Sequence, residues 1–362
     1  MKSPKIRFKE FNSEWNSTTL GDIFDYIRPD NYIVKSDKYS KNYNTPVLTA
    51  NKAFILGYTN EKNTFNKECV IFDDFTLDLK YVNFPFMVKS SALKILVLKE
   101  KSFNFGFCYE LLKKANIEIL GHARHYISVV QPTKTRIPSD MKEQEAIGEF
   151  FRKIDEILDL EKLRFKKFEN FKKTMLDKLF VASGENKPRL RLGSFISNWT
   201  SVTLGEVCEY KTSNLSNENI DKNGLYDLYD ANGVIGKTNK NTQKENYITI
   251  IKDGSGVGRV RLLPKNSSFI STMGAFTSKN SINFLYTILQ NFDFSSYING
   301  ATIPHIYFSD YKNAEIRIPS DPKEQEAIGE FFRKIDEILE LSQKRISKLE
   351  NIKKFLLNKM FV

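Results

Sequence analysis

Apolar residues recur with helical spacing in two long stretches of the chain, residues 140–181 and 321–362. Steps of three and four place these residues on one face of an α-helix. They are Ile147, Phe151, Ile154, Leu158, Phe165, Phe168, Met175 and Leu179, followed by Ile328, Phe332, Ile335, Leu339, Ile346, Leu349, Leu356 and Met360. The same register also passes through four polar residues, Glu161, Lys172, Ser342 and Lys353. Each stretch predicts a helix of about 40 residues and roughly 60 Å, with a coiled-coil seam.

Both helices carry start signals. Asp140 and Asp321 are good N-cap residues, and Glu143 and Glu324 follow three places later, as in a capping box. Pro322 fits the first helical position, where its missing N–H does no harm. We therefore place both helix starts directly after the two aspartates.

The two stretches repeat each other. Residues 136–181 and 317–362 begin 181 residues apart, which is half of the 362-residue chain. A single helix of this kind cannot bury its seam, but two similar helices can bury each other's. We predict an antiparallel pair that relates two halves by a pseudo-twofold axis and separates them as a spacer. The alternative is an ordinary helical hairpin inside one globular core, which the length and even spacing disfavour.

A second repeated signature, W-x-x-x-x-L-G-[DE], starts at Trp15 and at Trp199. Between signature and long helix, strand-like and helix-like segments alternate, so we predict an α+β fold with two mixed α/β modules. The predicted organisation is residues 1–139 for the first module, 140–181 for the first helix, 182–197 for a linker, 198–320 for the second module and 321–362 for the second helix. Within the first module, residues 1–13 read as a polar, basic arm.

Local patterns predict further elements. Thr19 and Thr203 suit the caps of short helices that run into residues 23–26 and 207–210. Residues 107–114 and 282–290 read as helices. Apolar, β-branched and aromatic runs predict strands at residues 70–72, 95–98, 126–130, 247–251, 260–263 and 269–271.

The net charge of +11 lies mostly outside the helices. Residues 140–181 are neutral and residues 321–362 carry +1, whereas residues 1–139 carry +7 and residues 182–320 carry +3. Nucleic acid is a natural partner for basic modules, and a Lys/Asn-rich surface without a partner is the alternative. Three cysteines without CxxC pairing suit a reducing cytoplasm. We expect neither a membrane span nor a signal peptide, because no apolar run is long enough.

Two glycine-containing motifs predict loops. Residues 231–238 end in Gly-Lys-Thr, but Ala231 replaces the first glycine of a phosphate-binding loop and no apolar strand precedes it, so a turn is favoured. Residues 252–259 follow a predicted strand and carry Gly254, Gly256 and Gly258. The segment after them reads as strand, which argues against a dinucleotide site. The loop is either a phosphate-backbone contact or a plain hairpin.

Other chemical signals are weak. Asn83-Phe-Pro-Phe86 departs from the Asn-Pro-Pro-Tyr motif of adenine methyltransferases and reads as a strand edge or turn. His122 and His125 have metal-like spacing but no cysteine or acidic partner close by in sequence, so exposed surface or DNA contact is favoured. No pattern indicates a catalytic centre, a cofactor site or a metal site in this chain.

The ordered, duplicated motifs resemble the specificity subunits of type I restriction-modification systems. The resemblance rests on the two W-x-x-x-x-L-G-[DE] entries, on Ile137-Pro138 to Glu143-Gln144 and Ile318-Pro319 to Glu324-Gln325, and on the helices that follow. It implies two target recognition domains, each reading one half of a split site in double-stranded DNA. It also implies that the helix pair sets the gap between the halves and docks two methyltransferase subunits.

The resemblance implies a non-catalytic subunit whose chemistry lies in its partners. S-adenosylmethionine is expected on the methyltransferase, which modifies adenine, and ATP and Mg²⁺ on the restriction subunits, an ATP-dependent nuclease. The DNA-contact candidates follow from charge and expected loop placement alone: Lys52, Lys80, Lys89, Arg124, Lys237, Lys252, Arg259 and Arg261. Two alternatives stay open at this point. One is a coiled-coil scaffold for proteins without DNA specificity, and the other is an enzyme with a hidden active site.

Overall fold

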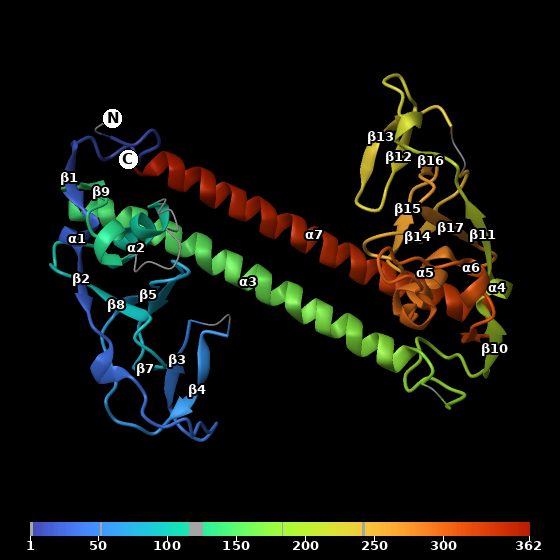
Figure 1. Ribbon diagram of the computed structural model, residues 1–362, viewed down its shortest axis with the longest axis horizontal. Helices are drawn as coiled ribbons and strands as arrows, with labels where there is room; N and C mark the ends of the chain where they lie inside the picture. The colour runs from blue at the N-terminus through green and yellow to red at the C-terminus, as the bar shows by residue number, and fades with distance from the viewer. Residues whose placement is uncertain (1–2, 51–52, 116–125, 183, 241–242) are drawn as a thin grey trace. The chain divides into compact units, whose positions relative to one another are not determined.

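The computed structural model describes residues 3–50, 53–115, 126–182, 184–240 and 243–362 (Figure 1). The chain divides into two compact units. Unit 1 comprises Met1–Lys162 and Lys344–Val362, and unit 2 comprises Leu163–Gln343. Each unit therefore combines one module with a portion of both long helices.

The described residues of unit 1 form two sheets and a two-stranded ribbon. The ribbon pairs β1 (Trp15–Thr19) with β9 (Lys134–Pro138), so the start and end of the module lie side by side. The antiparallel sheet has the order β2-β8-β5-β6, and a small mixed sheet has the order β4-β3-β7. The bounds are β2 (Phe24–Ile27), β3 (Thr45–Leu48), β4 (Ile55–Thr59), β5 (Cys69–Asp73), β6 (Leu79–Val82), β7 (Met87–Val88) and β8 (Leu93–Leu98), with helices α1 (Leu20–Ile23) and α2 (Phe105–Lys114).

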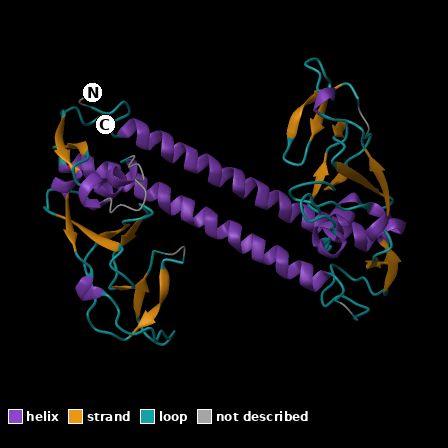
Figure 2. Cartoon of the chain, in the orientation of Figure 1, coloured by secondary structure: helices purple, strands orange, loops and turns teal. Residues whose placement is uncertain are grey.

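Unit 2 repeats this construction. Its ribbon pairs β10 (Trp199–Thr203) with β18 (Glu315–Pro319), and its sheets have the orders β11-β17-β14-β15 and β13-β12-β16. The bounds are β11 (Cys208–Thr212), β12 (Tyr226–Tyr229), β13 (Val234–Thr238), β14 (Tyr247–Ile251), β15 (Val260–Leu263), β16 (Ser267–Phe269) and β17 (Met273–Ser278), with helices α4 (Leu204–Val207), α5 (Ile282–Asn291) and α6 (Phe308–Tyr311). Figure 2 shows the same mix of helix and strand in both modules. The α+β prediction is confirmed.

The predicted long helices are confirmed. Helix α3 (Met141–Leu179) and helix α7 (Pro322–Met360) have 39 residues each. The Asp140 side chain accepts a hydrogen bond from the N–H of Lys142 at 2.9 Å, and Asp321 caps α7 in the same way. All the predicted seam residues of α3 and α7 are buried or half-buried. The register read from the sequence is therefore the packed one.

Within each unit, the two helix portions run antiparallel. In unit 1, Asp155 of α3 meets Lys353 of α7, and Lys162 further along α3 meets Glu350 further back along α7. In unit 2, Met175 and Leu179 pack with Ile328, Phe332 and Ile335 in one apolar cluster. The antiparallel pairing predicted from the repeat holds in both units.

One predicted strand is wrong. Residues 126–130 form a π-helical turn, closed by a hydrogen bond from the Gln131 N–H to the Tyr126 carbonyl at 2.9 Å. The apolar, β-branched composition favoured a strand. However, the two buried side chains, Tyr126 and Val130, lie four residues apart, which is helical spacing.

Two other predictions need adjustment. Strand β16 ends at Phe269, so residues 270–271 lie outside the strand predicted at residues 269–271. Helices α1 and α4 end at Ile23 and Val207, and strands β2 and β11 follow directly, so the short helices do not continue to residues 26 and 210. The Thr19 cap itself is confirmed, because its side chain accepts a hydrogen bond from the Asp22 N–H at 3.2 Å. The other predicted strands and helices are present within a few residues of their expected bounds.

Candidate nucleic-acid interface

Each module is fixed to its long helix by the Glu-Gln pair of the repeated motif. In unit 1, the Glu143 side chain is fully buried and binds the Arg7 guanidinium through both oxygens, at 2.6 and 2.7 Å. The indole N–H of Trp15 donates to the same carboxylate at 3.3 Å. Gln144 accepts from the Asn104 N–H at 2.9 Å and donates to the Pro138 carbonyl at 3.0 Å. The first turn of α3 thus joins the N-terminal segment, the ribbon and helix α2.

Unit 2 uses the same arrangement with residues from the linker. Arg191 binds both oxygens of Glu324 at 2.9 Å, and Gln325 donates to the Pro319 carbonyl at 2.8 Å. The glutamates therefore bind arginines from outside the helices, a role that the capping-box prediction did not include. Bidentate pairing of arginine with a buried carboxylate fixes the relative orientation of the two groups, which a single contact does not. We call each of these Arg–Glu pairs an arginine lock.

Sequence reasoning missed Arg7 and Arg191, although a signal existed. The pattern P-x-[IL]-R-[FL]-x-x-F-x-S-x-W runs from Pro4 to Trp15 and again from Pro188 to Trp199. The Ile6 N–H donates to the Lys359 carbonyl and the Leu190 N–H to the Lys178 carbonyl, both at 2.9 Å. Residues 4–15 are therefore not a free arm but the counterpart of residues 188–199, docked on the end of a long helix.

Aromatic residues complete the docking of the helix ends. Phe361, just beyond α7, stacks on Phe107 with ring centroids 5.1 Å apart and contacts Trp15 edge-on. Phe180, just beyond α3, stacks on Phe284 at 6.0 Å and contacts Trp199 edge-on. In each unit, the phenylalanine that follows a long helix thus packs against one phenylalanine and one tryptophan of the module. We call this arrangement the aromatic socket, and it holds the module against the helices.

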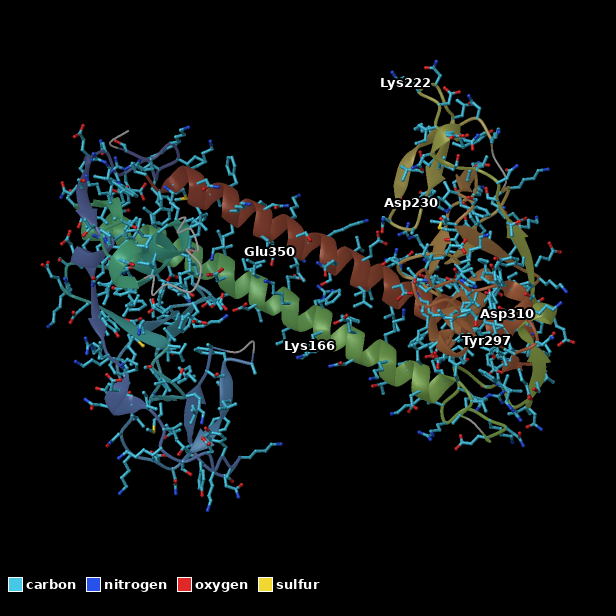
Figure 3. All side chains as sticks on the ribbon, in the orientation of Figure 1. Lys166, Lys222, Asp230, Tyr297, Asp310 and Glu350 are labelled. Carbon is cyan, nitrogen blue, oxygen red and sulfur yellow. The ribbon has the colours of Figure 1, made fainter. Side chains whose placement is uncertain are left out.

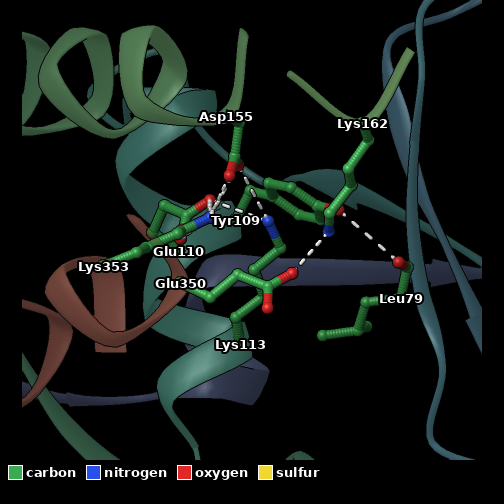
Figure 4. Close-up of polar contacts among 8 residues, drawn as sticks. All are labelled: Leu79, Tyr109, Glu110, Lys113, Asp155, Lys162, Glu350 and Lys353. Carbon is green, nitrogen blue, oxygen red and sulfur yellow. Dashed lines mark hydrogen bonds and ion pairs between the residues drawn. The ribbon is translucent and has the colours of Figure 1, made fainter. Parts of the chain in front are cut away.

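A charge cluster joins helix α2 to both long helices in unit 1 (Figure 4). Lys353 of α7 contacts Asp155 of α3 at 2.5 Å and Glu110 of α2 at 3.2 Å. Lys113 contacts Glu110 at 2.9 Å and Asp155 at 3.3 Å, and its ammonium lies 4.0 Å from the ring centre of Tyr109. Burial alone would raise the pKa of the Asp155 carboxyl, but the two lysines lower it below its usual range.

Unit 2 has a smaller version of this cluster. Lys172 of α3 contacts Asp336 of α7 at 2.6 Å and donates a hydrogen bond to the side-chain amide oxygen of Gln290 on α5 at 2.8 Å. Two of the polar interruptions predicted in the seams, Lys172 and Lys353, are thus paired with aspartates 181 residues apart in sequence. A third, Glu161, contacts Arg345 at 3.1 Å.

Four of the DNA-contact candidates lie in unit 2. Arg259 and Arg261 both donate to the Ala231 carbonyl, in the turn between β12 and β13, with 3.0 Å for Arg261. They therefore come together at that turn. Lys252 lies 3.7 Å from Asp253, and Lys237 on β13 lies 3.7 Å from Asp227. Figure 3 labels Asp230 beside this turn and Lys222 at the far end of the same small sheet.

Two candidates lie on described residues of unit 1. Lys80 is exposed on β6, and no ion-pair partner for it occurs among the described residues. Lys89 is paired with Asp37 and lies 6.0 Å from the ring centre of Tyr39. Lys52 and Arg124 lie outside the described residues, as do His122 and His125. Among the described candidates, Arg259 and Arg261 are brought together, and the DNA contacts of all eight stay predictions.

The two glycine motifs form hairpin turns. Residues 231–238 include the turn between β12 and β13 and strand β13 itself. Residues 252–259 connect the antiparallel strands β14 and β15, and Gly254, Gly256 and Gly258 all have positive φ, between 85° and 88°. Such backbone conformations favour glycine. The turn expected for residues 231–238 is confirmed, residues 252–259 form the hairpin that was one of two alternatives, and their phosphate contact stays a prediction.

Residues 83–86 behave as expected for a turn. The segment leads from β6 into β7, and Phe86 is buried against Phe65. The cysteines are free and buried, and burial raises the pKa of the Cys69 and Cys208 thiols to about 12. Across the described part of the chain, no group of three His, Cys, Asp or Glu side chains could hold a metal ion. No helix there is long and apolar enough to cross a membrane.

The chain matches one family model twice. The model of the type I restriction modification DNA specificity domain matches residues 12–169 and residues 196–351. Each match spans one module and most of the long helix that follows it. The two matches together cover well over half of the chain.

Individual relatives are consistent with this match. Over 132 residues the chain is 39% identical to the Escherichia coli type I restriction enzyme EcoR124I/EcoR124II specificity subunit, covering 34% of the chain and 32% of that relative. Over 183 residues it is 28% identical to the MjaVIII specificity subunit of Methanocaldococcus jannaschii, covering 45% of the chain and 42% of that relative. The aligned stretches thus span less than half of either relative.

A solved structure shares the fold along nearly the whole chain. The crystal structure of a type I restriction-modification system S subunit from M. genitalium superposes with a TM-score of 0.76, covering 99% of both chains at 18% identity. At this identity the likeness establishes the fold.

Proposed function

Because the chain belongs to the type I restriction modification DNA specificity domain family, we propose that it is the DNA-specificity subunit of a type I restriction-modification complex. Each unit reads one half of a bipartite site in double-stranded DNA. The helix pair sets the gap between the halves and docks two methyltransferase subunits. The observation that carries the proposal is the duplicated match, in which each copy consists of one basic module and one long helix.

The chemistry of the assembled complex belongs to the partner subunits in this proposal. The methyltransferase subunits bind S-adenosylmethionine and modify adenine, and the restriction subunits use ATP and Mg²⁺ to cleave DNA. The proposed role of this chain is to bind and position. Its rigid internal locks, Arg7 on Glu143 and Arg191 on Glu324, support that role because they fix each module on the helix that carries it.

Methylome sequencing tests the proposal directly. Cells that express this chain with its cognate methyltransferase are compared with cells that express the methyltransferase alone. We expect a new methylated-adenine motif with two specified halves and an unspecified gap. Co-purification of the two proteins without a new motif would contradict a role in DNA specificity and favour a protein scaffold.

Lys80 offers a sharper test of the predicted phosphate contacts. An exposed lysine that binds a phosphate releases counterions, so Lys80→Ala should weaken DNA binding equally for all sequences and make its salt dependence shallower. The slope of log Kd against log salt should fall by about one ion. Lys166→Ala on helix α3 serves as the exposed-lysine control. An unchanged slope for Lys80→Ala would remove this residue from the interface.

A further inference from the structure

A short hairpin in unit 2 projects one aliphatic side chain into solvent. Asn299 and His305 exchange both backbone hydrogen bonds, at 2.9 and 2.8 Å, and close a loop of five residues between them. Gly300 has a φ of +88°, and a Cβ there would lie 2.4 Å from the Ile303 carbonyl oxygen. Only glycine fits this position. The loop is therefore tightly defined by its own backbone.

The hairpin is anchored to the glycine-rich loop between β14 and β15. The Gly254 N–H donates to the Pro304 carbonyl at 2.9 Å, and the Ile306 N–H donates to the Lys252 carbonyl at 2.9 Å. Asp253 and His305 also form a β-bridge. The two loops thus form one double loop, held by backbone hydrogen bonds and flanked by the cations Lys252 and Arg259. Tyr297 and Asp310, labelled in Figure 3, bracket the hairpin in sequence.

Ile303 stands out in this double loop because its side chain is 66% exposed. Tyr307, 52% exposed, follows four residues later, with its ring 5.1 Å from that of His305. A branched aliphatic side chain held by a fixed backbone loses little conformational freedom when it binds, so it is suited to a defined apolar contact. With Lys252 and Arg259 against Asp253, the double loop carries a net charge of +1, which favours an anionic partner such as DNA.

We infer that Ile303 reads a thymine methyl group in the major groove of the half-site bound by unit 2. The inference rests on the proposed function and names one specificity-determining residue within it. The thymine C5-methyl is the apolar group that the major groove presents, and aliphatic side chains recognise it by contact. The cations of the double loop face the phosphates on either side, and the hairpin brings Ile303 to the base edges between them.

Leu225 provides a matched control in the same unit. Its side chain is 73% exposed, but it precedes β12 and lies outside the double loop. Both Ile303→Ala and Leu225→Ala remove exposed aliphatic groups, so both variants should keep the thermal stability of the parent chain.

The test uses the full chain in complex with its methyltransferase and a duplex carrying the motif found by methylome sequencing. Each thymine of the site is replaced in turn by deoxyuridine, which removes only the methyl group, and Kd is measured at fixed salt. For the parent chain, one replacement should weaken binding about fourfold, the amount expected for one buried methyl group. Ile303→Ala should bind both duplexes equally, and Leu225→Ala should keep the fourfold difference.

Several outcomes would overturn the inference. The parent chain could be indifferent to every thymine methyl group, or Ile303→Ala could retain the difference between thymine and deoxyuridine. Weaker binding by Ile303→Ala with that difference intact would indicate insertion between bases instead of methyl reading. Failure of the proposed function is distinguishable from these outcomes. In that case methylome sequencing gives no bipartite motif, and there is no site from which to build the duplex.

Discussion

At the residue scale, the lone glycine of each long helix decides how closely the module can approach. A Cβ on Gly148 would lie 2.6 Å from the Asn104 side-chain oxygen and 2.7 Å from the Phe107 backbone nitrogen. A Cβ on Gly329 would lie 2.5 Å from the Phe284 backbone nitrogen. In an ordinary helix interior, Gly→Ala stabilises by about 1 kcal/mol. Here the added methyl group pushes α2 or α5 away from the helix, so we expect Gly148→Ala and Gly329→Ala to destabilise by about 1–3 kcal/mol.

Chemical denaturation of the full chain measures this effect. Glu145→Ala, at an exposed position on the same turn of α3, controls for helix propensity and should change the unfolding free energy by less than about 0.5 kcal/mol. A stabilising Gly148→Ala would show that the contact with α2 is loose, and the close-approach argument would then fail.

The roles of individual residues are also what the sequence alone predicts least well. Glycine within an otherwise regular helical pattern was visible in the sequence, but its reason lies in Asn104 and Phe107, which are far away along the chain. The sequence alone places Arg7 in a basic arm, because its partner Glu143 lies 136 residues away. A comparison of residues 4–15 with residues 188–199 would have found it, since internal repeats report equivalent environments without any knowledge of contacts.

At the element scale, the helices were predictable because their periodicity is local and repeated, whereas the pairing of their polar seam residues was not. Lys353 and Lys172 interrupt the apolar seam, and only the antiparallel packing brings them to Asp155 and Asp336. The charge cluster of unit 1 yields a prediction. Asp155→Asn keeps the side-chain shape but leaves Lys353 and Lys113 with Glu110 alone, so it should destabilise the chain by about 1–2 kcal/mol at neutral pH.

The pH dependence of this loss follows from the lowered pKa of the Asp155 carboxyl. A carboxyl with a depressed pKa in the folded state contributes stability above its unfolded value, near 3.8, and loses it as the pH falls through the folded value. The gap between parent and Asp155→Asn should therefore be constant above about pH 5 and close as the pH falls below 3.8. Asp177→Asn, which removes an exposed pair with Arg189, should show no such gap. A gap that persists unchanged into acid would mean that packing, not charge, causes the loss.

At the scale of the whole molecule, the repeat of residues 4–15 and 188–199 means that the chain meets itself in the same way at two points. In unit 1 the Ile6 N–H docks on the Lys359 carbonyl, and in unit 2 the Leu190 N–H docks on the Lys178 carbonyl. In unit 2 the two contacting residues are joined by the linker, whereas in unit 1 they lie near opposite ends of this sequence. Figure 1 shows the C-terminal end of α7 beside the segment that precedes β1, as this docking requires. The same fold therefore accommodates the two modules in either order along the chain.

A circular permutant tests this argument. Val362 is joined to Met1 through three added residues, which makes the connection from Lys359 to Ile6 as long as the natural one from Lys178 to Leu190. New ends are opened in the linker between Gly184 and Glu185. Because both arginine locks and both aromatic sockets are kept, we expect the permutant to fold and to direct methylation to the same two half-sites with the same gap. A second permutant, opened between Asn170 and Phe171, cuts α3 within its last third and should lose this activity. If the linker permutant failed as completely as the helix permutant, the covalent connection between the units would carry structural information that the two matching junctions do not.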